Sequence, residues 1–102
     1  MKRWQLELLN ILRGSGFSEF QLAVYKATLK IPCGQTRTYT YLARQIRYPR
    51  AVRAVANALA KNPFPLLIPC HRVIRKDGSA GGYSGGKRFK ERLLVLEKSL
   101  FP

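Results

Sequence analysis

Acidic residues are scarce in this chain of 102 residues. Five Asp and Glu stand against 19 Lys and Arg, which gives a formal net charge of +14. A field of this sign repels cations and attracts polyanions. The imbalance argues against an acidic tail and favours nucleic acid, or less readily an anionic membrane surface, as the partner.

Metal ligands and long apolar runs are also lacking. Two cysteines cannot form a disulfide scaffold, and with one histidine they cannot complete a standard four-ligand zinc site. No stretch reaches the roughly 20 apolar residues of a membrane-spanning helix. Gln5, Glu7 and Asn10 interrupt any signal-peptide core. We therefore expect a cytoplasmic protein with free thiols and no metal site.

The length fits one domain, and apolar spacing with capping signals predicts a mainly helical chain. Helices are expected at about 2–13, after Ser18, after Thr38, at about 50–61 and at about 87–100. The buried face expected on the second helix is Phe20, Val24, Ala27 and Ile31. The core stripe expected on the last helix is Phe89, Leu93, Leu96 and Leu100. Residues 71–75 are interpreted as a strand, followed by a turn at 76–78, and a short β-hairpin is expected.

Two of these helices, joined by a tight turn at 47–49, predict a helix-turn-helix. The second is rich in alanine, which allows its axis to approach a DNA groove closely. Arg50 and Arg53 would contact phosphates or reach between bases. The alternative is that the alanines pack against the protein and the arginines are solvated. Few side chains suit base-edge reading, so little sequence specificity is expected.

A cysteine stands beside the only histidine, at Cys70 and His71. A thiolate is a strong nucleophile, and a neighbouring base or cation lowers the pKa of a thiol. Because adjacent strand residues point to opposite faces, a water or a strand bend would have to connect the two. Glu97 could orient the imidazole as a third group. The alternative is a buried structural cysteine with a satisfied histidine, and Cys33 is interpreted as a structural thiol.

The glycine-rich segment 81–88 nearly fits a phosphate-binding loop. Arg88 stands where that motif needs a Ser or Thr to hold magnesium, which excludes nucleoside triphosphate binding. The segment carries Tyr83 and Ser84, and the wall or lid of a small pocket is expected here. A plain surface turn is the alternative.

Together these segments resemble the O6-alkylguanine-DNA alkyltransferase family, specifically its C-terminal DNA-binding and active-site domain. The family motif Pro-Cys-His-Arg-Val stands at 69–73, with Asn62-Pro63 before it and Gly-Tyr-Ser-Gly-Gly at 82–86 after it. The resemblance implies a winged helix-turn-helix-like alkyltransferase fold. Residues 18–102 would form this domain and residues 1–17 a helical lead, in place of the N-terminal domain that family members usually carry.

The resemblance also implies a single-use DNA repair activity, that of a methylated-DNA–protein-cysteine S-methyltransferase. Cys70 would accept the alkyl group from O6 of guanine. His71, acting through a water and oriented by Glu97, would be the base. Asn62 would brace the active-site turn. Tyr39 would help to rotate the target nucleotide and would protonate the departing guanine.

The implied partner is double-stranded DNA containing alkylated guanine, bound through the minor groove by a monomer that needs no cofactor. Arg53 would fill the gap left in the duplex by the flipped base. The residues implied for the base pocket are Leu59, Val73, Tyr83 and Ser84. The other residues expected at the DNA surface are Arg50, Ala51, Thr40 and Ala56. The expected place is the cytoplasm and nucleoid of a prokaryote, or the nucleus of a eukaryote.

Two alternatives remain open. An alkyltransferase-like lesion binder would sense damage without transferring the group, but such relatives replace the acceptor cysteine, usually with Trp or Ala, whereas Cys70 is present here. A winged helix-turn-helix regulator would prefer one DNA sequence and would need neither Cys70 nor His71. One departure from the family is Tyr48 before Pro49, where a smaller polar residue is usual.

Overall fold

The computed structural model describes residues 1–77 and 87–100. Within these ranges the chain is mostly helical, and none of its helices is both long and apolar enough to span a membrane. The elements are α1 (Arg3–Gly14), α2 (Glu19–Leu29), β1 (Arg37–Thr38), α3 (Tyr39–Gln45), α4 (Val52–Ala60), the 3-10 turn η1 (Cys70–Arg72), β2 (Val73–Ile74) and α5 (Lys87–Leu100).

The predicted caps begin α2 and α3. The Ser18 hydroxyl accepts the backbone N–H of Gln21 at 3.1 Å, and the Gln21 side chain accepts the Ser18 N–H at 2.9 Å. The Thr38 hydroxyl accepts the N–H of Tyr41 at 3.0 Å. These bonds satisfy donors that a helix start leaves unpaired. Between α1 and α2 the chain reverses at Gly16, whose φ of 93° suits glycine.

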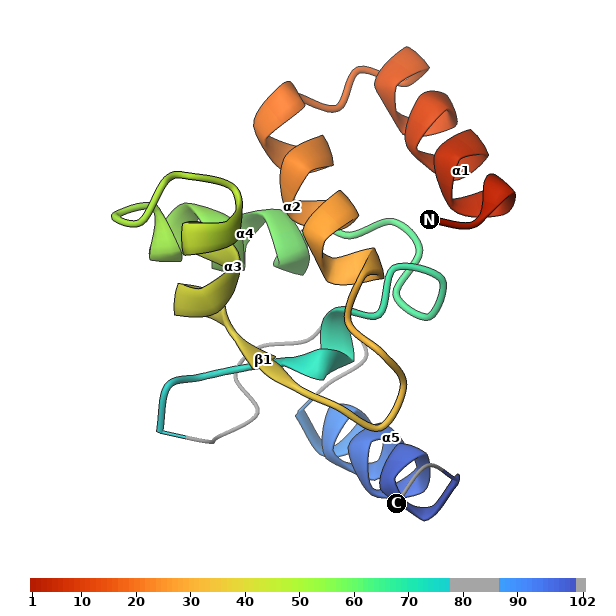
Figure 1. Cartoon of the computed structure of the whole chain (residues 1–102), viewed down its shortest axis with the longest axis vertical. Coiled ribbons are helices and arrows are strands. Elements are labelled where there is room, and N and C mark those ends of the chain that lie inside the picture. Colours follow the sequence, from red (N-terminus) through yellow and green to blue (C-terminus); the bar gives the residue numbers. More distant parts are fainter. Residues whose placement is uncertain (78–86, 101–102) are drawn as a thin grey trace.

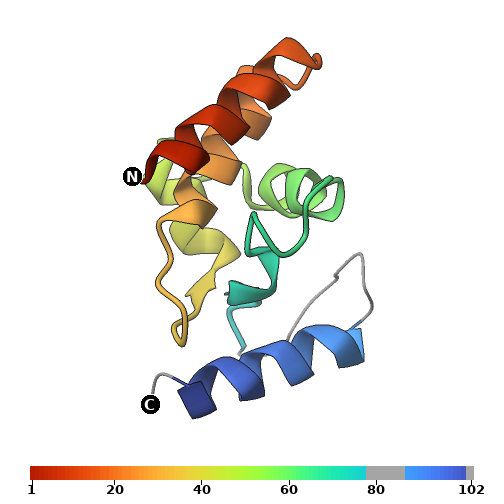
Figure 2. The ribbon, with the colours of Figure 1, turned by 90° about the vertical axis from the view of Figure 1, so that its right-hand side faces the viewer.

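Helix α2 lies at the centre of a four-helix group (Figure 1). Helix α1 packs along it, and α3 and α4 pack against its other side as the helix-turn-helix. Helix α5 lies at the opposite end of the molecule from α1, and η1 lies between α5 and the four-helix group (Figure 2). The chain segment that carries Cys70 is therefore placed where two parts of the fold meet.

The two strands differ from the sequence prediction. They pair in parallel, Arg37 with Val73 and Thr38 with Ile74, so the expected β-hairpin is wrong for the described residues. The expected strand over 71–75 is also shorter, because Cys70–Arg72 form the 3-10 turn and only Val73 and Ile74 are strand. The turn closes because the N–H of Arg72 donates to the carbonyl of Pro69 at 2.9 Å.

The core differs from the predicted helix faces at two helices. On α2, Val24 is buried as expected, and so is Ile31 just beyond its end, but Phe20 and Ala27 are only partly buried. The α2 residues that are buried are Leu22, Val24, Tyr25, Thr28 and Leu29. On α5, the predicted stripe is wrong, because Phe89, Leu96 and Leu100 are 46%, 54% and 63% exposed.

The buried positions of α5 are instead polar. Lys90 is fully buried, and Glu97 is 9% exposed. Helix α5 packs against η1, which presents His71 and Arg72. A buried charged group is stable only with charged or hydrogen-bonding partners, so the polar face of α5 is the one that fits this turn.

Candidate active site

Asn62 holds the loop that leads to Cys70. Its side-chain N–H donates to the carbonyl of Ile68 at 2.8 Å, and its side-chain oxygen accepts the N–H of Phe64 at 2.8 Å. Asn62 is buried, so both groups of its amide are used in place of water. The thiol of Cys70, 3% exposed, lies 3.9 Å from the carbonyl oxygen of Pro65. One amide therefore fixes the conformation of the loop against which the thiol rests.

The carboxylate of Glu97 contacts two consecutive residues of η1. Its Oε2 lies 2.8 Å from Nε2 of His71 and 2.8 Å from Nη2 of Arg72. Nε of Arg72 donates to Oε1 at 3.0 Å. The same guanidinium donates through Nη1 to the carbonyl of Ile31 at 2.9 Å. Arg72 thus connects α5 to the end of α2, and Glu97 fixes the imidazole of His71.

The electrostatics of this group decide the tautomer of His71. Burial alone would raise the pKa of Glu97, but hydrogen bonds from Arg72 and His71 lower it to about 2. Glu97 is therefore ionised at neutral pH and can only accept hydrogen bonds. Burial lowers the pKa of His71, an effect that Glu97 partly opposes, so the imidazole is neutral. Its Nε2 must then carry the proton given to Glu97, which leaves the lone pair on Nδ1 as a base.

Lys90 supplies a cation to the other side of the site. It is fully buried, its Nζ lies 3.3 Å from the phenolic oxygen of Tyr39, and it stands 5.6 Å from the centre of that ring. Burial lowers the pKa of Lys90 to about 8, with the charge of Cys70 acting in the opposite direction. Burial raises the pKa of Cys70, while a hydrogen bond from Asn62 and the charge of Lys90 lower it.

No role for Lys90 is predicted from the sequence. One signal was available, because Lys90 and Glu97 are seven residues apart and so share a helix face. The family resemblance implies that Tyr39 is the proton donor. Burial raises the pKa of its hydroxyl, and the charge of Cys70 raises it further. The raised pKa keeps the phenol of Tyr39 protonated at neutral pH, so that it holds a proton to donate.

Cys33 also lies in a polar setting that its sequence neighbours do not show. Burial raises the pKa of Cys33, and so does a hydrogen bond to the Glu97 carboxylate, while Arg72 lowers it. The second thiol therefore stands beside the carboxylate that orients His71.

The expected DNA-contact residues come together in part. A cavity of about 420 Å³ is lined by Tyr39, Val52, Arg53, Ala56 and Arg75. Arg53 is exposed. Near the end of the same helix, α4, the carbonyl of Ala58 accepts a hydrogen bond from the hydroxyl of Tyr25 at 2.8 Å. A second cavity, of about 410 Å³, is lined by Arg47, Tyr48, Pro49, Arg50 and Ala51. Thr40 is half-buried at the start of α3 and lines neither cavity.

Of the four residues expected in the base pocket, the structure describes Leu59 and Val73. Leu59 and Val73 are buried in the core and are not among the residues lining either cavity. Tyr83 and Ser84 lie outside the described residues. Within the described ranges, no group of His, Cys, Asp and Glu side chains is arranged to hold a metal ion.

A family model described as the DNA-binding domain of 6-O-methylguanine DNA methyltransferase matches residues 19–99. The chain belongs to this family. The match covers the helix-turn-helix, Cys70 and Glu97.

Two relatives named methylated-DNA–protein-cysteine methyltransferase are about 50% identical to this chain over the aligned residues. The one from Methanothermobacter thermautotrophicus is 49% identical over 89 residues, which cover 87% of this chain and 49% of the relative. The inducible one from Bacillus subtilis is 52% identical over 81 residues, which cover 79% of this chain and 45% of the relative. The chain thus spans about half the length of these curated relatives.

Solved structures of the methyltransferase family confirm the mainly helical alkyltransferase fold. Mycobacterium tuberculosis OGT in complex with DNA superimposes with a TM-score of 0.81 and 48% identity, covering 85% of this chain and 54% of that one. S. pombe Atl1, in complex with damaged DNA containing O6-carboxymethylguanine, gives a TM-score of 0.72 and 31% identity, covering 80% of this chain and 78% of that one.

Proposed function

We propose that this protein is a single-use DNA repair alkyltransferase. It removes an alkyl group from O6 of guanine in double-stranded DNA and keeps that group on Cys70. The observation that carries this function is the position of the Cys70 thiol. It is buried in a 3-10 turn in which the next residue, His71, is paired with Glu97. The charge of Lys90 also acts on this thiol. A thiol needs a base or a cation to react as a thiolate at neutral pH.

In the proposed reaction, the proton of the Cys70 thiol passes to Nδ1 of His71 through a water. The sulfur then forms a bond to the alkyl carbon while the bond from that carbon to O6 of guanine breaks. The electron pair of the broken bond remains on the guanine, which takes a proton from Tyr39. The thioether is stable, so each molecule reacts once, and no cofactor takes part.

The positive charge of Lys90 has two uses in this reaction. It stabilises the thiolate of Cys70 before attack, and it stabilises the phenolate of Tyr39 after that group has given up its proton. Both effects are strong because Cys70, Tyr39 and Lys90 are buried, where the effective dielectric constant is low. Lys90 acts by its charge at both groups and exchanges no proton in the overall balance.

The target guanine must leave the duplex before Cys70 can reach it, at a cost of a few kcal/mol. In the proposed complex α4 lies in the minor groove, where the small side chains Ala51 and Ala56 allow a close approach. Arg53 fills the space vacated by the base. Arg50 and Thr40 contact phosphates, and Leu59, Val73, Tyr83 and Ser84 complete the base pocket.

The proposed unit for this activity is residues 18–102, with residues 1–17 as a helical lead. It acts as a monomer on DNA in the cytoplasm and nucleoid, or in the nucleus of a eukaryotic cell. The large excess of positive charge supports DNA as the partner, because such charge gives salt-dependent affinity for any DNA and so aids the search for damage.

The test is a mass measurement after incubation with a duplex oligonucleotide that carries O6-methylguanine. A gain of about 14 Da, one methyl group replacing a proton, is expected from transfer to the nucleophile. Peptide mapping places it on Cys70, and Cys33→Ser, the matched control, gains the same mass. An unchanged mass in a protein that still binds the duplex contradicts the function.

A lesion binder without transfer activity is the second candidate. It is favoured by the similarity to S. pombe Atl1, whose crystal structure contains damaged DNA. Selective binding of damaged duplex by the wild-type protein, with no mass gain, would identify it. A sequence-specific regulator is distinguished by a competition experiment, in which it prefers one undamaged sequence over a random damaged one.

A further inference from the structure

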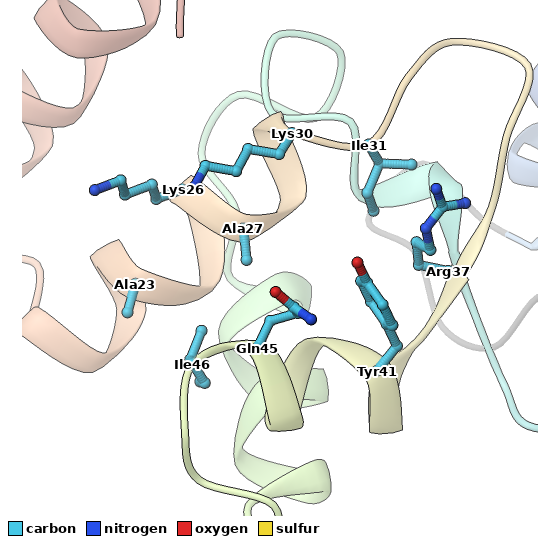
Figure 3. Close-up of a pocket in the computed structure, with 9 residues that line it drawn as sticks. All are labelled: Ala23, Lys26, Ala27, Lys30, Ile31, Arg37, Tyr41, Gln45 and Ile46. Carbon is cyan, nitrogen blue, oxygen red and sulfur yellow. The ribbon is translucent and has the colours of Figure 1, made fainter.

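A basic cavity of about 280 Å³ lies between α2 and α3 (Figure 3), and no residue of the proposed DNA-binding helix α4 lines it. Its lining residues are Ala23, Lys26, Ala27, Lys30, Ile31, Arg37, Tyr41, Gln45 and Ile46. The lining includes neither Arg53 nor Tyr39, so this cavity is separate from the candidate active site.

The sequence builds the cavity from small and polar side chains. Ala23 and Ala27 are four residues apart on one face of α2, and their size leaves space above that face. Tyr41 and Gln45 are likewise four apart on α3. The Tyr41 hydroxyl and the Gln45 amide point toward this space (Figure 3). Among the described residues, neither of these side-chain groups forms a hydrogen bond, so both are available to a ligand.

Two cations stand at the edges of the cavity. Arg37 is held in place because its guanidinium donates to the carbonyl of Thr36 and to the side chain of Gln35, both at 2.8 Å. It also lies 5.6 Å from the centre of the Tyr41 ring. Lys30 extends along α2 at the opposite edge, while Lys26 points toward α1 (Figure 3).

No acid among the described residues neutralises Lys30 or Arg37. Within the described ranges, the salt bridges of Glu7, Glu19 and Glu97 go to other residues, and Lys30 and Arg37 form no ion pair. Lys30 and Arg37 both line the cavity, and two positive charges at its edges favour an anion there. A guanidinium fixed by other hydrogen bonds is preorganised for a phosphate group, because its remaining N–H groups keep one direction.

The geometry points to a binding site for a nucleotide phosphate in this cavity. The phosphate lies between Lys30 and Arg37, and the attached sugar or base lies over Ala27 and against Tyr41, with Gln45 as a hydrogen-bonding partner. The volume is at the small end of ligand pockets and suits one nucleotide unit. An aromatic ring beside cations is the combination that binds nucleic acid units without sequence preference.

The phosphate has two sources, a free nucleoside monophosphate or a strand of a second nucleic acid segment. No residue of α4 lines the cavity, so a ligand there and DNA on α4 do not compete for the same residues. With a strand as the source, one molecule would contact two segments of DNA. Neither source requires the repair chemistry proposed for Cys70.

The test compares two double variants of equal charge. Lys30→Gln/Arg37→Gln removes both cations from the cavity. Arg3→Gln/Lys98→Gln removes two exposed cations elsewhere and is the matched control. In the first arm, adenosine monophosphate is added while backbone amide NMR signals are recorded. In the second arm, protein already bound to an immobilised duplex is offered a second, fluorescent duplex.

We expect wild type and control to bind in at least one arm, and the cavity variant to bind at least about tenfold more weakly, since two charged hydrogen-bond donors are lost. Signal shifts at Lys30, Tyr41 and Gln45 identify the free nucleotide. Capture of the second duplex without such shifts identifies the strand. Binding of neither probe, or equal binding by both variants, overturns the site. Alkyl transfer, measured in parallel, reports on Cys70 alone.

Discussion

The Nζ atom of Lys90 lies 3.3 Å from the phenolic oxygen of Tyr39, and both residues are buried. An ammonium group loses much of its hydration in such a place, which is why burial lowers the pKa of Lys90 to about 8. Most molecules still carry the charge at neutral pH. One cation therefore acts on both the proposed nucleophile and the proposed proton donor.

Replacing Lys90 by Met is expected to slow alkyl transfer at pH 7 and to shift the pH–rate profile toward alkaline pH. The Cys70 thiolate loses its stabilising cation, so a higher pH is needed to form it. Single-turnover rates on methylated duplex, measured from pH 6 to 10, give the profile. Arg92→Met, at an exposed position of the same helix, is the control. An unshifted profile would show that Lys90 has only a structural role.

The same substitution is expected to stabilise the protein. The pKa of Lys90 is about 8 in the folded protein and 10.5 ordinarily, so between these values the unfolded chain binds more protons and stability rises with pH. Below pH 8 the full cost of burying the charge is present. Lys90→Met removes that cost, up to about 3 kcal/mol. Urea denaturation at pH 7 measures it, and a clear loss of stability contradicts the expectation.

Glu97→Gln is expected to remove part of the acid sensitivity of the fold. The pKa of Glu97 is about 2 in the folded protein and 4.5 ordinarily. Its stabilising contribution is therefore complete above pH 4.5 and is lost as the pH falls through 2. The variant should be less stable at pH 7 and show a shallower decline in unfolding free energy between pH 4.5 and 2. If the unfolding free energies of wild type and variant fell in parallel over this range, Glu97 would not be a source of the acid sensitivity.

Asn62→Ala is expected to destabilise the fold by about 2–3 kcal/mol, because it leaves the carbonyl of Ile68 and the N–H of Phe64 without their partner. Thermal and urea unfolding measure the loss. Asn57→Ala, at an exposed position of α4, should change stability little. Equal effects of the two substitutions would exclude a bracing role for Asn62.

Arg53→Ala is expected to slow the repair of O6-methylguanine in duplex DNA by about tenfold or more, while free O6-alkylguanine base reacts nearly as before. The arginine is needed only where a flipped base leaves a gap. Rates on the two substrates give the comparison. Arg44→Ala, at an exposed position of α3, is the control. Equal slowing on both substrates would place Arg53 in the chemistry instead of in base flipping.

Sequence patterns predicted the helices well because their signals are local. Ser18 and Thr38 cap the helices that follow them, and an apolar period marks each helix whatever it packs against. The face of α5 was predicted wrongly because counting apolar residues assumes an apolar partner, and its partner is the polar turn η1. The parallel pairing of Arg37 with Val73 depends on distant parts of the chain, which no local signal encodes.

The site was predicted in the same uneven way. A pairing of His71 with Glu97 was expected from the residues themselves and again from the family resemblance, and Nε2 of His71 lies 2.8 Å from Oε2 of Glu97. The burial of Lys90 was not predicted, because a lysine is buried only when its tertiary neighbours accept the charge. Cys33 was interpreted as structural from its sequence neighbours, and Glu97 reaches it from the other end of the chain.

The use of one carboxylate by both His71 and Arg72 has a consequence for engineering this protein. A newly introduced acidic side chain near η1 would compete with Glu97 for Arg72. If Glu97 moved as a result, it would no longer hold the imidazole of His71 in place. Variants meant to reduce nonspecific adhesion to DNA by lowering the charge of +14 should therefore replace cations by neutral residues. If acids are added, the exposed face of α1 is the safer location, since it lies at the far end of the molecule (Figure 2).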